Sequence, residues 1–297
     1  MGDPEMRDDR LKVGVVGAGP WATLVHAPMI AASEQTELSG VWARRPEAAS
    51  NLAGAHGTTA CASFDELLER SEAIAFAVPP DVQADLAVLA ARAGKGLLLE
   101  KPIALEFRDA ERLVAAIDEA GVASQMLLSW RYSSRVRDFL DAVHTAEPVG
   151  GRGWFLTGLF VGDMFATPWR LERGPLLDLG PHVLDLLDAA LGPIVDVRAH
   201  GDRLSWIGIQ AEHASGVVSD ISLTASTRLD PARAGAEVYS SDGVIEVDTG
   251  NVFDQDVMAR AVTEFVEAVR GRSPHRLDAH RGLHLQRLID QAERQLR

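Results

Sequence analysis

Short apolar runs alternate with helical patterns along the first half of the chain. Strands separated by helices in this way are typical of a parallel sheet covered by helices on both faces. Pro79 and Pro80 close the third apolar run, since proline cannot continue a strand ladder, and Asp81 is the expected cap of the next helix. The pattern predicts strands at residues 11–16, 38–43, 73–78, 96–99 and 122–127, and helices at 21–33, 46–56, 81–93 and 107–120.

The second half of the chain has a different rhythm, with five consecutive β-like runs from residue 195 to residue 247 and no helices between them. Asp242-Gly243 is a hairpin signal between the last two runs. The pattern predicts strands at residues 152–161, 195–200, 206–211, 217–227, 236–240 and 244–247, and helices at 176–191, 257–270 and 281–296. We therefore expect an α/β chain, with a doubly wound parallel sheet in residues 1–125. Residues 126–297 should form an α+β domain with a mainly antiparallel open sheet, and the last helix can pack back on the first domain.

Composition and charge indicate which kinds of binding partner and which cell compartment to expect. The chain has 29 Lys and Arg against 43 Asp and Glu, a net charge of −14, and its longest basic run is Arg44-Arg45. Nucleic-acid binding needs a basic stripe, so it is not expected. No apolar run reaches the roughly 18 residues of a membrane span, and the polar N-terminus lacks a leader-like apolar core. With the single Cys61, expected to be a small buried residue, these features favour the reducing cytoplasm.

A glycine-rich turn follows the first predicted strand. Gly17, Gly19 and Ala22 fit the pattern G-x-G-x-x-A, with Pro20 and Trp21 between the last two. The glycines permit a tight turn and a close approach to a pyrophosphate, which would lie at the N-terminus of the next helix. The turn follows a strand and opens a helix within a βαβ series, as the dinucleotide-binding motif requires. We therefore expect a Rossmann domain that binds a nicotinamide dinucleotide.

The end of the second strand bears on which dinucleotide is bound. A site for NAD usually has Asp or Glu there, whereas a site for NADP uses arginine for the 2′-phosphate. This chain has Arg44 and Arg45 and no acid. NADP(H) is therefore favoured over NAD(H). The alternative interpretation is that both arginines are solvated surface residues that bind no phosphate. Val78 and Pro79, at the end of the third strand, are expected to line the cofactor site.

Lys101 stands at the end of the fourth predicted strand, between Glu100 and Pro102. In doubly wound sheets this edge faces the ligand crevice, so the ammonium could exchange a proton with a substrate oxygen beside the nicotinamide. Glu100 and Lys101 are therefore also expected at the cofactor. Only three lysines occur in the chain, and arginine could not exchange a proton near neutral pH. The alternative is a salt bridge at a surface turn.

Asp178, His182 and Asp185 are spaced four and three residues apart. On one helix this spacing places all three on a common face. Gly180-Pro181 is unusual inside a helix, so Asp178 is expected to precede the helix and Pro181 to lie near its first turn. An acid and a histidine beside a nicotinamide are suited to proton transfer. One alternative is that Asp178 is an N-cap and His182 a structural residue, and another is that the histidine and an aspartate bind a metal. We expect no metal, because the spacing supplies no third ligand.

In combination these motifs resemble the Gfo/Idh/MocA family, the glucose–fructose oxidoreductase and inositol dehydrogenase type. The glycine turn, Glu100-Lys101-Pro102 and the D-x-G-x-H-x-x-D run from Asp178 to Asp185 carry the resemblance. Two shorter segments add to it: Ser129-Trp130-Arg131-Tyr132, similar to N-R-[FY], and Trp169-Arg170. The resemblance implies that Lys101 and His182 are the acid–base residues and that Asp178 supports the substrate.

The sequence departs from the family pattern at two places. Gln83 stands where the family often has histidine, and the glycine-rich run before the aspartate is shortened to Arg173-Gly174-Pro175. Six other histidines have no motif context and are expected to be structural or surface residues: His26, His200, His213, His275, His280 and His284.

The leading hypothesis is an NAD(P)-dependent oxidoreductase that transfers hydride between the nicotinamide and a sugar, cyclitol or related small hydroxyl or carbonyl compound. The resemblance also implies an open sheet face that supports a homodimer or homotetramer. One alternative is a non-catalytic dinucleotide-binding regulatory or scaffold protein. Another is an enzyme that uses the nicotinamide transiently, as in some glycoside-cleaving relatives.

Overall fold

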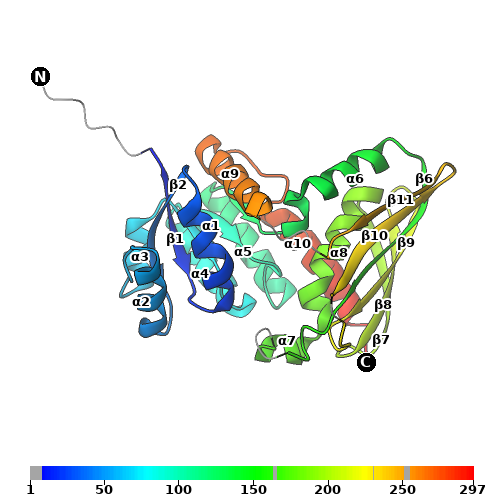
Figure 1. The fold of residues 1–297 in the computed structure, drawn as a ribbon, viewed down its shortest axis with the longest axis horizontal. Coiled ribbons are helices and arrows are strands. Elements are labelled where there is room, and N and C mark those ends of the chain that lie inside the picture. The colour runs from blue at the N-terminus through cyan, green and yellow to red at the C-terminus, as the bar shows by residue number, and fades with distance from the viewer. Residues whose placement is uncertain (1–8, 163–165, 230, 251–254) are drawn as a thin grey trace, which may run out of the picture.

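The computed structural model describes residues 9–162, 166–229, 231–250 and 255–297, and it has two lobes (Figure 1). The polar N-terminus, for which the sequence predicts no leader-like apolar core, lies largely outside these residues. The first lobe holds the parallel sheet and the second holds a larger open sheet. Between them run helices that join the two lobes (Figure 1).

The first sheet has five parallel strands in the order β2-β1-β3-β4-β5, which confirms the predicted doubly wound arrangement. Its strands are buried because helices cover both faces. The strands are β1 (Leu11–Val16), β2 (Thr36–Trp42), β3 (Ala73–Phe76), β4 (Gly96–Leu99) and β5 (Ser124–Met126). The helices are η1 (Ala22–His26), α1 (Ala27–Ala32), α2 (Pro46–Ala55), α3 (Phe64–Arg70), α4 (Pro80–Arg92) and α5 (Phe107–Ala120). The proposed division after residue 125 falls within β5.

Three local details of this lobe differ from the sequence prediction. The helix after β1 begins as a π-helix, η1, before it continues as α1. Pro79, not Asp81, occupies the cap position of α4, and Asp81 lies in the first turn. Helix α3 was not predicted, although Ser63 caps it by accepting a hydrogen bond from the Glu66 N–H at 3.1 Å. This short amphipathic segment is stabilised by packing on β2 and β1, which a local pattern does not reveal.

The second sheet has the order β11-β10-β6-β9-β8-β7. Only the β6–β9 pair is parallel, so the sheet is mainly antiparallel as predicted. Helix α8 packs on one face, where it passes so close to Gly153 that a Cβ there would lie 2.6 Å from Val183. Side chains that alternate between buried and exposed leave the other face open. The strands are β6 (Pro148–Leu156), β7 (Ile194–Gly201), β8 (Trp206–His213), β9 (Val218–Thr224), β10 (Arg233–Ser240) and β11 (Gly243–Asp248).

Two closing helices return to the first lobe. The Ala279 N–H donates to Ser124 Oγ at 3.0 Å, and the Gln125 side chain donates to the Ala261 carbonyl at 2.8 Å. The last helix, α10, also packs on α8 and β7, so it joins both lobes. The remaining helices are η2 (Ser129–Tyr132), α6 (Ser134–His144), α7 (Pro168–Arg173), α8 (Pro175–Leu191), α9 (Gln255–Gly271) and α10 (Ala279–Glu293).

A buried carboxylate fixes α10 against α8. Asp188 accepts hydrogen bonds from the Ile194 N–H at 2.8 Å and from His284 at 2.7 Å, and it pairs with Arg281. Burial by itself raises the pKa of Asp188, but His284 and Arg281 outweigh it and lower this pKa to about 2. The ionised carboxylate therefore stabilises the junction of the lobes.

Asp188→Asn should lower the free energy of unfolding at neutral pH by about 2 kcal/mol, the value of a pKa lowered from 3.8 to about 2. Because the folded-state pKa is the lower one, this contribution is complete above the unfolded pKa and is lost as the pH falls through the folded pKa. Urea unfolding at pH 7 and at about pH 3.5 should therefore show a smaller difference from wild type at the lower pH. An equal difference at both pH values would contradict this assignment, and Asp138→Asn, an exposed site on α6, is the matched control.

Candidate functional site

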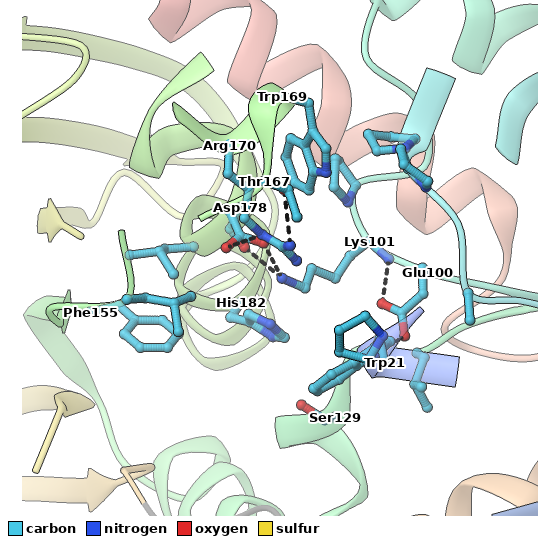
Figure 2. Close-up of a pocket in the computed structure, with 18 of the residues that line it drawn as sticks. Trp21, Glu100, Lys101, Ser129, Phe155, Thr167, Trp169, Arg170, Asp178 and His182 are labelled. Atoms are coloured by element: carbon cyan, nitrogen blue, oxygen red, sulfur yellow. Dashed lines mark hydrogen bonds and ion pairs between the residues drawn. The ribbon is translucent and has the colours of Figure 1, made fainter. Parts of the chain in front are cut away.

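A cavity of about 420 Å³ lies between the two lobes. Figure 2 shows side chains from both lobes that converge on it. Of the residues expected in the site, nine line this cavity: Gly19, Pro20, Trp21, Val78, Pro79, Glu100, Lys101, Asp178 and His182. Arg170, from the Trp-Arg motif, also lines it. Apolar and aromatic side chains make up much of the rest of the described lining, including Leu127, Trp130, Phe155, Leu159, Trp169 and Leu179.

The glycine turn has the geometry that a phosphate-binding turn needs. Gly17 has a φ of +114°, and a Cβ there would lie 2.3 Å from the Ala77 carbonyl oxygen, so only glycine fits. At Gly19 a Cβ would meet no atom within 4 Å, which leaves open space on the cavity side. Ala22 is fully buried, as close helix–strand packing requires. The turn therefore has the backbone conformation of a phosphate-binding turn, and its second glycine, Gly19, lines the cavity.

Arg44 and Arg45 follow the end of β2 and are exposed. They do not line the cavity. The Gly17 N–H donates to the Trp42 carbonyl at 2.8 Å, so the two arginines follow a segment bound directly to the glycine turn. Among the described residues, neither arginine forms an ion pair, and both are exposed.

Glu100 lines the cavity, and its carboxylate accepts hydrogen bonds from side chains of the first lobe. Its Oε1 accepts hydrogen bonds from the Trp21 indole at 2.5 Å and from His26 at 2.8 Å. In an α-helix, residues five apart point about 140° away from each other. The π-turn of η1 brings Trp21 and His26 to one carboxylate instead. His26 was expected to be a structural or surface residue; it is fully buried and supports the site through Glu100.

Gln83 holds the segment that carries Lys101. Its amide donates to the Glu100 and Ile103 carbonyls at 2.8 and 3.1 Å, and its oxygen accepts from the Glu100 N–H at 2.8 Å. Gln83 is fully buried on α4. The residue that stands in place of the family's frequent histidine therefore fixes the backbone from Glu100 to Ile103.

Lys101 crosses between the lobes to the start of α8. Its Nζ donates to both the carbonyl and Oδ1 of Asp178 at 2.8 Å (Figure 2). Arg170 donates to the other carboxylate oxygen of Asp178 at 3.0 Å. Burial by itself raises the pKa of Asp178, but Lys101 and then Arg170 outweigh it, and this pKa falls to about 2. Asp178 is therefore ionised at neutral pH and orients the lysine.

His182 lies one turn further along α8 and faces the same cavity. Burial, followed by the charge of Lys101, lowers the pKa of His182 well below its ordinary value, against an opposing effect of Asp178. Its imidazole is therefore neutral near pH 7. Its Nδ1 is buried without a hydrogen-bond partner among the described residues, which leaves Nε2 as the nitrogen available to a bound molecule.

The helix that carries these residues differs from the prediction in two ways. Asp178 lies in the first turn of α8 and does not precede it, and Pro181 lies inside the helix. Pro175 begins the helix instead, at the position where proline is best tolerated. Asp185 does not line the cavity; it pairs with Arg131 at 3.1 Å and with Arg281 at 2.6 Å. A shared helix face therefore did not mean a shared site.

Two further features concern metal-ligating side chains and membrane-spanning helices in the described part of the chain. Among them, no group of three or more His, Cys, Asp and Glu side chains is placed to hold a metal ion. None of the helices in the described ranges has the length and apolar character needed to cross a bilayer. The single Cys61 is buried, which raises the pKa of its thiol.

Several residues of the site had no clear signal in the sequence. Phe155 and Leu159 come from segments without a functional motif, and Trp130 lies in the N-R-[FY]-like segment at a position to which the sequence assigned no role; all three line the cavity. Arg170 stood in the Trp-Arg motif, but its contact with Asp178 depends on the turn between α7 and α8, where Gly174 has a φ of +76°. The geometry as a whole brings an ammonium, an ionised carboxylate and a neutral imidazole to one cavity, a set suited to proton transfer.

Comparison with known proteins places the first lobe in an oxidoreductase family. Residues 11–127 match the family described as "Oxidoreductase family, NAD-binding Rossmann fold" (GFO_IDH_MocA). The dTDP-3,4-didehydro-2,6-dideoxy-alpha-D-glucose 3-reductase of Streptomyces violaceoruber is 32% identical over 193 residues, 63% of this chain and 56% of the reductase. The NADP(+) scyllo-inositol 2-dehydrogenase IolU of Bacillus subtilis is 24% identical and aligns over 80% of this chain and 76% of its own length.

The whole fold also has a match among solved structures. GenD2 from gentamicin A biosynthesis, in complex with NAD, superimposes with a TM-score of 0.86 at 21% identity, covering 99% of this chain and 96% of GenD2. At this identity the likeness concerns the fold. The family match shows that residues 11–127 form a Rossmann domain of the Gfo/Idh/MocA oxidoreductase family, and the likeness over the whole chain shows that both lobes have the fold of GenD2.

Proposed function

We propose that this chain is an NAD(P)-dependent oxidoreductase that acts on a CH–OH group of a sugar, a cyclitol or a related small molecule. The observation that carries the proposal is the Lys101 ammonium, held by Asp178 in a cavity that the glycine turn also lines. A bound nicotinamide would supply or accept the hydride. Relatives named as a sugar reductase and an inositol dehydrogenase support the substrate class.

The chain's own residues would manage the proton of the reacting hydroxyl. Lys101 would bind the substrate oxygen and give or take its proton, and Asp178 would keep the lysine in place. Neutral His182 can accept or share that proton through Nε2, because its lowered pKa keeps it unprotonated near pH 7. The aromatic lining would limit the contact of these groups with water during the transfer.

The sequence after β2 favours NADP(H). Arg44 and Arg45 are exposed beside the glycine turn, where a 2′-phosphate would lie. Two guanidinium groups can bind a phosphate dianion through paired charge-assisted hydrogen bonds. Relatives and structural neighbours include proteins named with NADP and with NAD, so the preference of this chain rests on these two arginines.

Lys101→Ala should lose about 100- to 10,000-fold in turnover, the usual contribution of general acid–base catalysis. Cofactor binding should persist, because the glycine turn is unchanged. Turnover on a panel of hexoses, deoxyhexoses and cyclitols, with nicotinamide fluorescence for binding, measures both effects. Exposed Lys12→Ala is the control. Wild-type turnover in Lys101→Ala would overturn the role of the lysine, while cofactor binding without turnover in the wild type would favour a non-catalytic protein.

Arg44→Ala with Arg45→Ala should weaken NADPH binding by about 10- to 100-fold, since hydrogen bonds to charged groups contribute about 1.5–3 kcal/mol. NADH binding should stay nearly unchanged and serves as the internal reference. Arg92→Ala, at an exposed site on α4, controls for loss of positive charge. Equal weakening of both dinucleotides, or of neither, would contradict a phosphate-binding role.

The open face of the second sheet is proposed as the contact between subunits of a homodimer. Val218 on β9 and Trp206 on β8 are exposed on this strand pair, at 41% and 48%. Val218→Arg would place a charge in such an interface and should shift the protein toward monomer in light scattering after gel filtration. Glu119→Arg, an exposed site on α5 in the first lobe, is the control. A wild-type protein that is monomeric across the micromolar range would contradict the proposal.

A further inference from the structure

Trp130 stacks on His182 at the wall of the cavity. Their ring centroids lie 5.1 Å apart with an interplanar angle of 26°. Phe155 flanks the same imidazole at 6.2 Å with an angle of 54°. Trp130 and His182 are 5% and 8% exposed, so the imidazole is enclosed by aromatic rings on more than one side.

No hydrogen bond within the described part of the chain orients His182 through Nδ1. Active-site histidines are commonly oriented by a bond at the nitrogen that does not react. His213, away from the cavity, shows the usual arrangement, since one ring nitrogen contacts the Gly192 carbonyl at 2.7 Å and the other contacts Ser219 at 2.8 Å. Packing must therefore supply the orientation of His182 that a hydrogen bond supplies at His213.

The indole of Trp130 is fixed in turn by the short 3₁₀-helix η2. Successive side chains of such a helix point about 120° apart, and here each has a separate partner. Trp130 meets His182, Arg131 pairs with Asp185 at 3.1 Å, and the Tyr132 hydroxyl donates to the Met126 carbonyl at 2.9 Å. His182 and Asp185 lie three residues apart on α8, so the stack and the ion pair join the same two segments.

We propose that Trp130 is a positioning residue for His182: its indole sets the plane of the imidazole and excludes water from it, while the Arg131–Asp185 pair holds the indole in place. Trp130 occupies a segment that resembles N-R-[FY], at a place where the family motif has asparagine. The position therefore supplies an aromatic surface in this chain. The catalytic consequence rests on the proposed function, but the effect on His182 does not.

The electrostatics of His182 agree with this role. Burial is the largest cause of its lowered pKa, and Lys101 adds to the lowering while Asp178 opposes it. Arg170 is the other charged side chain at Asp178. Loss of the indole would admit water to the imidazole and remove part of the burial, whereas Lys101 and Asp178 would be unchanged. The pKa of His182 should then rise toward its ordinary value.

The test is a titration of His182 by NMR in protein labelled with ¹⁵N-histidine, with His182→Gln used to assign the signal. In the wild type, His182 should stay neutral with one ring tautomer between about pH 5.5 and 7.5, where an ordinary histidine titrates. Trp130→Leu should make it titrate in this range and mix its tautomers. Trp130→Phe keeps an aromatic face and should preserve the wild-type behaviour.

Leu89→Ala, at an exposed apolar site on α4, is the control and should leave His182 unchanged. If Trp130→Leu lacks the near-ultraviolet circular dichroism of a folded protein, Trp130→Met replaces it, because methionine fills volume without an aromatic face. A neutral, single-tautomer His182 in the folded leucine or methionine variant would overturn the proposal. So would an ordinary titration of His182 in the wild type.

Kinetics give a second readout that depends on the proposed function. Trp130→Leu should lower kcat by about 10- to 100-fold, the scale expected for a misplaced catalytic group. The acid limb of the pH profile should move to higher pH, and Trp130→Phe should restore most of kcat. If the wild type turns over no substrate, the proposed function fails while the NMR result on His182 still stands. An unchanged pH profile in an active Trp130→Leu enzyme would contradict the positioning role.

Discussion

The buried ion pair between Lys101 and Asp178 is the interaction on which the candidate site depends. It joins the end of β4 in one lobe to the start of α8 in the other, across 77 residues of sequence. Taking two charges out of water is costly unless further hydrogen bonds satisfy them. Arg170 satisfies the second carboxylate oxygen, and the Asp178 carbonyl accepts from the same ammonium. The same ion pair therefore joins the two lobes and orients the lysine side chain.

The two proton-handling side chains are supported in different ways. The position of Lys101 is supported by hydrogen bonds of the preceding residue, Glu100. Gln83 accepts from its backbone N–H, and its carboxylate accepts from the indole of Trp21 and the imidazole of His26. His182 is held by aromatic packing and lacks a partner at Nδ1 among the described residues. Hydrogen bonds fix position but also tune charge, whereas apolar packing keeps an imidazole neutral by removing water. This division suits a site in which the cationic and neutral groups lie close together.

Much of the first lobe could be predicted from local patterns. The helix predicted at 107–120 is found at Phe107–Ala120, because its apolar spacing is regular and Gly121 ends it with a φ of +61°. Helix α3 and the π-turn η1 were not predictable in the same way. The first is stabilised by packing on two strands, and the second by the shared contacts of Trp21 and His26 with Glu100. Both depend on residues distant in the sequence.

The sequence by itself determined the residue types and their places at the ends of strands: the glycine turn, the lysine after β4, the arginines after β2 and the aspartate and histidine of α8. Tertiary structure decided which of them meet. Asp178 and His182 face the cavity, while Asp185 on the same helix turns to Arg131 and Arg281. The reason is that spacing sets directions only within one element. The partners of each side chain follow from how the lobes bury their apolar surfaces against each other.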